Sequence, residues 1–283
     1  IVGINGIILK TTNAGNNWIS LNSGTIRFLR AVFFVDDNIG YVAGDAGTIL
    51  KTTNAGVNWI PKNSRINNNI NSIYFINNNV GYCAVDSGKV LKTINSGQNW
   101  NTIYNTPDPY NIYGVQFINL NTGFLTSELG KIYKTSNSGS NWVLQPVSTT
   151  LDLNSIDFAD SLNGLIAGAG GRIIKTTDGG NNWFIQTSNT PSHLQSVSYL
   201  NFNSAIVAGF NGTILKTTNG GLTWIIQPKV TNNNLYSVSI LNENSSIAFG
   251  DFGAIVKTNN AGLVSVEQNV LTSNPSEFKI NNI

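Results

Sequence analysis

Acidic residues recur at almost equal spacing in the first half of the chain. Asp45, Asp86 and Glu128 lie 41 and 42 residues apart, and Asp152 follows them. If a repeating fold brings three such carboxylates to one face, they could hold a cation, a sugar or a basic peptide segment. An Asp before x-Gly is also a favoured hairpin-turn residue, so turn formation alone could account for most of these acids.

Arginine supplies the complementary charge. The chain has four arginines, which are Arg27, Arg30, Arg65 and Arg172. Their planar guanidinium groups suit recognition of carboxylates or phosphates. Acids and arginines together favour a polar ligand or a protein partner over an extended polyanion.

Two sets of these residues have the types needed to cleave a glycan. A retaining or inverting glycosidase needs two carboxylates roughly 5 to 9.5 Å apart. A sialidase needs an arginine triad, a tyrosine nucleophile with a glutamate partner, and an acid. The chain has the types for both sets in Asp45, Asp86, Glu128, Asp152, Arg30, Arg65, Arg172, Tyr113 and Tyr236. No spacing motif links the members of either set, so a glycan hydrolase is the alternative and a non-catalytic protein is the prediction.

The chain lacks the residues needed for a serine or cysteine triad and for a histidine metal site. His193 is the only histidine, which leaves a serine or cysteine triad without a base and argues against a histidine metal site. Cys83 is the only cysteine, so it has no internal disulfide partner. We therefore predict no metal and no cofactor.

The elements that position these residues come from an internal repeat. One sequence motif occurs seven times at steps of 41 or 42 residues, starting from Gly6. Its pattern is glycine-x-aliphatic-x-Lys-Thr-x-Asn/Asp-small-Gly-x-x-Trp. A fixed period of about 40 residues is typical of propellers and other repeat folds. The seventh copy has Ser265 in place of the tryptophan.

The second repeat indicates four short strands. Short turns separate four segments whose residue types and alternation are typical of strands: Phe28 to Val35, Gly40 to Gly44, Thr48 to Thr52 and Asn58 to Lys62. Parallel pairing is excluded because a crossover needs a dozen or more residues. Four-stranded antiparallel units at this spacing bury both faces by stacking radially. The prediction is an all-β, seven-bladed β-propeller, or an eight-bladed one if residues are missing upstream.

The repeat also carries a family resemblance. Thr176 to Trp183 resembles the Asp-box of neuraminidase-type (BNR) repeats. The full repeated motif is similar to the repeat motif of the photosystem II stability and assembly factor family and its non-photosynthetic relatives. The resemblance covers about residues 1 to 268 and implies the propeller fold. It implies no single function, because the box also occurs in sialidases, xyloglucanases and surface proteins.

The box residues are predicted to be structural. Asn or Asp accepts backbone N–H groups in a turn, glycine takes a positive φ, and tryptophan fills the space between blades. Asn replaces Asp in all copies but one, which removes the charge that Ca²⁺ prefers. The predicted box residues are Asn13, Gly15, Trp18, Asn54, Gly56, Trp59, Asn95, Gly97, Trp100, Asn137, Gly139, Trp142, Asp178, Gly180, Trp183, Asn219, Gly221 and Trp224.

The face opposite the boxes is where the repeats differ. The first and third residues of each predicted inner strand vary between polar and aromatic types, and the acids of the second turn lie at the same end. We expect these side chains to line one mouth of the central channel. The predicted contact surface comprises Arg30, Asp45, Asp86, Tyr113, Glu128, Asp152, His193 and Tyr236.

Composition and the chain ends limit the remaining possibilities. A net charge of +2 does not indicate a nucleic-acid surface, and no stretch has the roughly 20 apolar residues that span a bilayer. We expect one propeller domain over residues 1–268 and a tail over 269–283. The tail contains Ser276 to Ile280, which either closes the ring or belongs to a linker, since its register fits the inner strands badly.

These observations predict an exported, extracytoplasmic, monomeric scaffold that binds a protein or glycan partner at the channel mouth. The alternatives are a sialidase- or xyloglucanase-like hydrolase and a passive module of a larger cell-surface protein.

Overall fold

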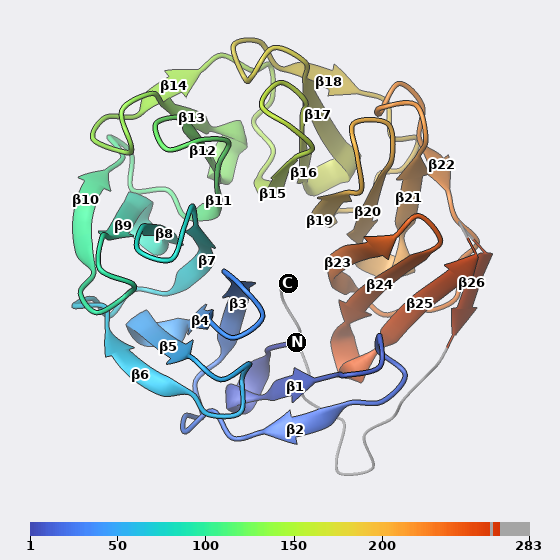
Figure 1. The fold of residues 1–283 in the computed structure, drawn as a ribbon. Helices are drawn as coiled ribbons and strands as arrows, with labels where there is room; N and C mark the ends of the chain where they lie inside the picture. Colours follow the sequence, from blue (N-terminus) through green and yellow to red (C-terminus); the bar gives the residue numbers. More distant parts are fainter. Residues whose placement is uncertain (261–262, 267–283) are drawn as a thin grey trace.

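The chain folds into a ring of small antiparallel sheets. The computed structural model describes residues 1–260 and 263–266. These residues form six four-stranded sheets and one two-stranded sheet around a central channel (Figure 1). In each four-stranded sheet the strands follow one another in chain order. The predicted all-β propeller with four-stranded antiparallel blades is therefore confirmed.

The six blades are numbered here in chain order, each from its innermost strand outward. Blade 1 contains β3 (Leu29–Phe34), β4 (Gly40–Gly44), β5 (Thr48–Thr52) and β6 (Ile60–Asn63). Blade 2 contains β7 (Ile70–Phe75), β8 (Gly81–Val85), β9 (Lys89–Thr93) and β10 (Asn101–Asn105). Blade 3 contains β11 (Ile112–Phe117), β12 (Gly123–Ser127), β13 (Ile132–Thr135) and β14 (Val143–Gln145).

Blades 4 to 6 complete the series. Blade 4 contains β15 (Leu153–Phe158), β16 (Gly164–Gly168), β17 (Arg172–Thr176) and β18 (Phe184–Gln186). Blade 5 contains β19 (Leu194–Tyr199), β20 (Ala205–Gly209), β21 (Ile214–Thr217) and β22 (Ile225–Ile226). Blade 6 contains β23 (Leu235–Asn242), β24 (Ser245–Gly250), β25 (Ile255–Asn260) and β26 (Leu263–Val266).

The prediction of seven four-stranded blades, with eight as its alternative, is wrong. The N-terminal sheet holds only β1 (Ile8–Lys10) and β2 (Ile19–Leu21), with Val2 bridged to Ile8. The repeated motif lies in the third and fourth strands of a unit. Its seven copies therefore indicate seven outer hairpins, not seven whole blades. The predicted tail, residues 269–283, lies outside the described residues.

Neighbouring blades interlock through aromatic rings. The ring of Phe75, from the inner strand of blade 2, stacks on Tyr41 of blade 1 with centroids 3.9 Å apart. The same ring meets Trp100 edge-on at 5.8 Å. Phe117 repeats this arrangement between Tyr82 and Trp142. The tryptophans of the repeat thus lie where one blade packs on the next, and Trp100 is fully buried.

The turn before each tryptophan is held by a threonine and by an asparagine or, in one copy, an aspartate. In blade 1 the Thr52 hydroxyl donates to Asn54 Oδ1 (3.0 Å) and accepts the Gly56 N–H (2.9 Å). Asn54 Oδ1 also accepts the Asn58 N–H at 2.9 Å. Gly56 has φ +81°, a left-handed conformation that costs glycine little. The turn therefore satisfies its backbone donors locally.

Asp178, the one acid among these turns, gives a test of their structural role. Burial alone would raise the pKa of Asp178, but hydrogen bonds from Asn182, Thr176 and Asn181 lower it to about 2. By analogy with a helix cap, Asp178→Ala should lower the free energy of unfolding by about 1 kcal/mol at pH 7, whereas Asp178→Asn should change it little.

The pH dependence of this effect follows from the sign of the shift. Because the folded pKa lies below the unfolded value of about 3.9, the carboxylate stabilises the fold above pH 4 and loses this effect as the pH falls towards 2. Urea unfolding of wild type, Asp178→Asn and Asp178→Ala between pH 2 and 7 measures the difference. Equal stability of Asp178→Ala and wild type at pH 7 would contradict a structural role.

Candidate functional site

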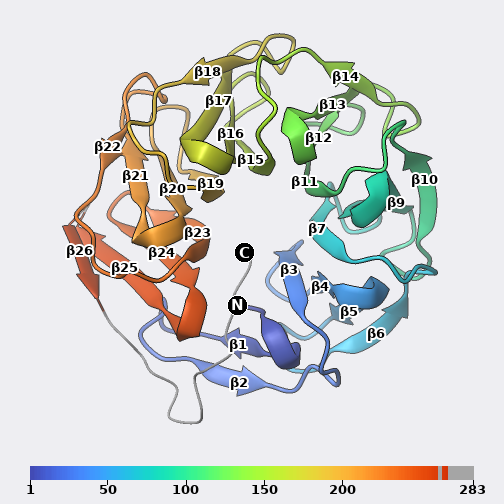
Figure 2. The same cartoon turned by 180° about the vertical axis from the view of Figure 1, so that it is seen from behind.

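One face of the ring carries a set of tight turns around the channel. Six of them connect the second and third strands of the four-stranded sheets, and the seventh precedes β1 of the N-terminal sheet; Figure 2 shows them as short coils facing the viewer. We call this side the η-turn face. The turns are η1 (Ile4–Gly6), η2 (Asp45–Gly47), η3 (Asp86–Gly88), η4 (Glu128–Gly130), η5 (Ala169–Gly171), η6 (Phe210–Gly212) and η7 (Asp251–Gly253).

Each of these turns places its middle residue in the left-handed region. The φ angles are 52° for Ala46, 60° for Ser87, 53° for Leu129 and 54° for Phe252. A left-handed conformation costs a residue other than glycine roughly 1–2 kcal/mol. These turns aim the middle side chain outward, and Leu129 and Phe252 remain 43% and 59% exposed.

The predicted contact residues all lie at this end of the blades, and Asp45, Asp86 and Glu128 each pair within their own blade. The Arg30 guanidinium forms an ion pair with Asp45 and lies over the Phe28 ring, 4.8 Å from its centroid. The two oxygens of Asp86 accept the side-chain amides of Asn69 (2.9 Å) and Asn71 (2.7 Å). These contacts fix the orientation of both carboxylates.

Glu128 and Tyr113 form the corresponding pair in blade 3. The Tyr113 hydroxyl donates to Glu128 Oε1 at 3.0 Å, and the Asn111 amide donates to the same oxygen at 2.8 Å. Burial, with the neighbouring Glu128 carboxylate, raises the pKa of Tyr113 well above its ordinary value. Tyr113 therefore keeps its proton at physiological pH and donates it in the hydrogen bond to Glu128.

A hydrogen-bond relay connects the turns from blade to blade. The N–H of Ala46 donates to Asn69 Oδ1 of the next blade (3.2 Å), and the N–H of Ser87 donates to Asn111 Oδ1 (3.0 Å). Asp152 accepts the N–H of Leu129 in the same way at 3.0 Å. The middle residues of these three turns are thereby tied to the residue that precedes the inner strand of the next blade. Asp152 thus has a structural partner as well as a place on the predicted contact surface.

Aromatic residues gather on the other side of the mouth. The exposed His193 ring stacks on Phe210 with centroids 5.4 Å apart, and Phe210 meets Tyr236 edge-on at 6.0 Å. The Tyr236 hydroxyl donates to Asp251 Oδ2 at 3.2 Å. Burial, with the Asp251 charge, raises the pKa of Tyr236 to about 12. This cluster offers flat apolar surface beside a few polar groups.

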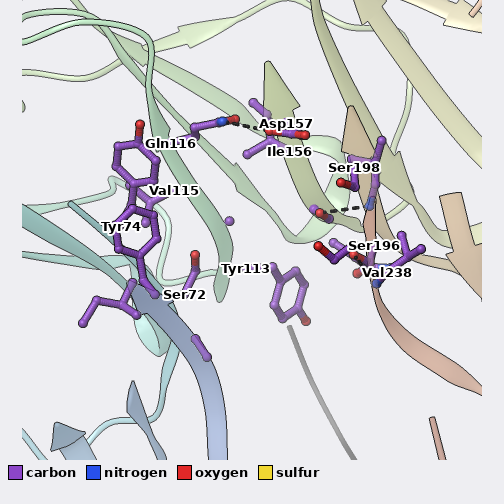
Figure 3. Close-up of a pocket in the computed structure, with 18 of the residues that line it drawn as sticks. Ser72, Tyr74, Tyr113, Val115, Gln116, Ile156, Asp157, Ser196, Ser198 and Val238 are labelled. Atoms are coloured by element: carbon purple, nitrogen blue, oxygen red, sulfur yellow. Dashed lines mark hydrogen bonds between the residues drawn. The ribbon is translucent and has the colours of Figure 1, made fainter. Parts of the chain in front are cut away.

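The channel below the mouth contains a polar cavity of about 250 Å³. Figure 3 shows Tyr113 among its lining residues and the hydrogen bond between Gln116 and Asp157. Asp157 accepts the Gln116 amide at 3.0 Å and the Tyr199 N–H at 2.7 Å, so its carboxylate joins three successive blades. Burial raises the pKa of Asp157 to about 6 despite these bonds.

Sequence reasoning missed Asp157 and the exposed middle residues of the turns. The signal for Asp157 was a carboxylate in a repeat column that otherwise holds Phe33, Tyr74, Gln116 and serines. The signal for Leu129 and Phe252 was an apolar residue before a turn glycine, where asparagine is preferred.

Three kinds of arrangement are absent from the described residues. Within residues 1–260 and 263–266, no three His, Cys, Asp or Glu side chains are grouped to hold a metal ion. No hydrogen bond in this part of the chain joins Asp45, Asp86 and Glu128 to one another. The described residues also include no helix long and apolar enough to cross a membrane.

Comparisons with known proteins agree with the propeller fold described above. The sequence matches the family model of photosynthesis system II assembly factor YCF48 over residues 11–151 and 144–264. No curated protein sequence matches the chain.

Solved structures share the fold at low sequence identity. A structure of YCF48 bound to D1 peptide matches with a TM-score of 0.73 and 19% identity, covering 90% of this chain and 84% of that one. YCF48 from Cyanidioschyzon merolae matches with a TM-score of 0.71 and 16% identity, covering 86% of each chain. A GH74 enzyme of Niastella koreensis has a TM-score of 0.73 and 16% identity, covering 92% of this chain but 52% of its own. These identities support the fold alone.

Proposed function

Because the chain belongs to the family of photosynthesis system II assembly factor YCF48, we propose that it is a protein-binding assembly scaffold. In this proposal the η-turn face holds an extended segment of a client protein. The structural relative bound to a D1 peptide supports a peptide as the kind of ligand that such a propeller takes. The D1 peptide is the ligand of that relative, and the proposal for this chain does not depend on a photosystem.

The exposed turn residues are the observation that carries the proposal. Leu129 and Phe252 are large apolar side chains that stand in solvent on strained, left-handed turns. Strain of this kind persists where the surroundings enforce it and often marks functional positions. Apolar side chains on a polar rim are the usual anchors for a protein partner.

The predicted contact residues supply the polar part of the proposed surface. Arg30, Asp45, Asp86 and Glu128 present charges that are already oriented by their own blades. A client segment would meet these groups on one side of the mouth and the rings of His193 and Tyr236 on the other. Such a surface recognises mixed polar and apolar sequence better than a long run of one charge.

We also propose that the scaffold is non-catalytic and extracytoplasmic. The separate pairing of Asp45, Asp86 and Glu128, each within its own blade, supports the first part. The second part follows from the Asn-, Thr- and Ser-rich composition and from the export of most of the relatives that the repeat resembles. A glycan hydrolase remains the alternative, and it requires turnover of aryl glycosides that Glu128→Gln or Asp86→Asn removes.

Paired variants on opposite faces test the proposal. A library of fluorescent 15-residue peptides is screened by anisotropy against the whole chain, and the affinity of each bound peptide is then measured with Phe252→Ala and His193→Ala. We expect Kd to rise about tenfold or more, the effect of losing an interface anchor worth about 1.4 kcal/mol. The matched controls are Ile94→Ala and Leu222→Ala, which are 71% and 72% exposed on the opposite face.

The outcomes separate the hypotheses. Weaker binding only in the η-turn variants, with melting temperatures unchanged, supports the scaffold. Equal losses in all four variants would show non-specific adhesion, and glycoside turnover without peptide binding would favour the hydrolase.

A further inference from the structure

Blade 1 contains a complete guanidinium site of its own on the η-turn face. The Arg30 guanidinium pairs with Asp45, the first residue of η2, and lies over the Phe28 ring, 4.8 Å from its centroid. A carboxylate beside an aromatic ring holds a guanidinium in two ways, because the oxygen accepts its N–H groups and the ring attracts its charge. Blade 1 therefore shows which side chains this face needs in order to hold such a group.

Blade 6 has the carboxylate of that site but not the guanidinium. Asp251 is the first residue of η7, the position of Asp45 in η2, and Tyr236 lies in the repeat column of Arg30. Asp251 Oδ2 accepts the Asn234 amide at 2.9 Å and the Tyr236 hydroxyl at 3.2 Å. These two bonds orient the carboxylate, and Oδ1 has no hydrogen-bond donor among the described residues.

The other acids at this turn position are already satisfied. Asp45 has its arginine, and both oxygens of Asp86 accept side-chain amides within blade 2. Both oxygens of Glu128 also accept hydrogen bonds within blade 3. Within residues 1–260 and 263–266, Asp251 is therefore the one acid at this position with neither a cation nor donors on both oxygens.

Aromatic rings of blade 5 lie beside this carboxylate. Phe210 holds in η6 the position that Asp251 holds in η7, and the two turns belong to neighbouring blades (Figure 2). The Phe210 ring meets the Tyr236 ring edge-on, with centroids 6.0 Å apart and an interplanar angle of 81°. The exposed His193 ring stacks on Phe210 at 5.4 Å. We call these three rings, together with Asp251, the aromatic corner.

The charge around the channel also favours a cation. The predicted contact residues and Asp251 together have one guanidinium, that of Arg30, and five carboxylates, those of Asp45, Asp86, Glu128, Asp152 and Asp251. Lys89, Lys131 and Arg172 lie at the third strands of their blades, farther from the channel. The whole chain has a net charge of +2, so this excess of carboxylates is local. Such an excess attracts cationic groups to the mouth.

We propose that the aromatic corner binds the guanidinium of an arginine side chain in the client segment, an inference that rests on the proposed scaffold function. Asp251 Oδ1 accepts an N–H of the guanidinium, while an aromatic ring of the corner lies along its plane. The client thereby supplies to blade 6 the group that Arg30 supplies to blade 1. Arginine suits the corner better than lysine, because a planar guanidinium can stack on a ring and donate hydrogen bonds from its edge at the same time.

Matched peptides test whether the charge is recognised. Each arginine-containing peptide that binds in the anisotropy screen is made again with its arginines replaced in turn by citrulline, a neutral urea of nearly the same shape. We expect Kd to rise about tenfold or more at one position, since the charge-assisted hydrogen bond and the cation–π contact are both lost there. Equal affinities for arginine and citrulline peptides, or bound peptides that lack arginine, would overturn the proposal.

Variants of the aromatic corner assign the effect to its residues. Asp251→Asn removes the charge, and Phe210→Leu removes a ring but keeps an apolar side chain, so each should abolish most of the difference between the paired peptides. The controls are Asp37→Asn and Phe202→Leu, which make the same changes at exposed residues in turns at the opposite end of the blades. They should leave the difference unchanged. If Phe210→Leu folds poorly, Asp251→Asn decides the test, and a full difference in that variant would contradict the proposed site.

The only histidine of the chain gives a readout that needs no client peptide. His193 belongs to the aromatic corner, so its ring signals in NMR spectra report on this place alone. Millimolar N-acetyl-arginine amide at constant pH should shift these signals in wild type but not in Asp251→Asn, and N-acetyl-citrulline amide should shift neither.

The two measurements separate this inference from the proposed function. Arginine-dependent shifts of the His193 signals without any bound peptide would refute the scaffold and support the guanidinium site. Peptide binding that ignores arginine, with no such shifts, would support the scaffold and overturn the guanidinium site.

Discussion

Replacing Trp100 by alanine will lower the free energy of unfolding by about 3–5 kcal/mol, the usual cost of truncating a buried tryptophan. Trp100 is fully buried and meets the Phe75 ring that stacks on Tyr41 of the neighbouring blade. The change therefore removes packing inside blade 2 and also loosens its contact with blade 1. Urea unfolding followed by circular dichroism measures the loss.

Ile94→Ala is the matched control for this prediction. Ile94 belongs to the same blade but is 71% exposed, so its truncation should change stability by no more than about 0.5 kcal/mol. A loss below about 1 kcal/mol for Trp100→Ala would show that the repeated tryptophans do not hold the blades together.

Gly171→Ala will be among the most damaging alanine substitutions on the η-turn face. Gly171 has φ +72°, and a Cβ there would lie 1.8 Å from the carbonyl oxygen of Thr190. The left-handed backbone costs about 1–2 kcal/mol for alanine, and the forced shift adds about 1–3 kcal/mol. We expect a total loss of about 2–5 kcal/mol in the free energy of unfolding.

Gly24 separates the two contributions. It has φ +73°, but no described atom lies within 4 Å of its Cβ position. Gly24→Ala should therefore cost only the backbone term of about 1–2 kcal/mol. Equal melting temperatures for the two alanine variants would contradict the steric argument.

The repeated part of the fold was predictable because each column of the repeat is sampled many times. In blade 1 the predicted strands Gly40–Gly44 and Thr48–Thr52 match β4 and β5. The predicted strand from Phe28 to Val35 extends one residue beyond each end of β3. A single copy of the repeat would not show where its strands begin and end. The alternation and the turn residues recur in every copy, and this recurrence indicates the ends of the strands.

The features that break the repeat were not predictable in the same way. The number of complete blades depends on inner strands, which the regular spacing of Lys and Trp does not count. The joining of three blades by Asp157 depends on which side chains meet across blades, and one column of the repeat does not contain that information. For the predicted contact residues, the repeat indicates the face on which they lie but not the partner that each acid takes.

The relay of amide groups around the mouth has a consequence for recognition. Since Asn69, Asn111 and Asp152 each tie a turn to the next blade, the side chains on those turns are held in place before any partner arrives. Ordering a flexible loop or side chain on association costs free energy, which weakens the net affinity of the complex. A preorganised rim avoids this entropic penalty, so a client segment would contribute nearly all of the disorder lost on docking.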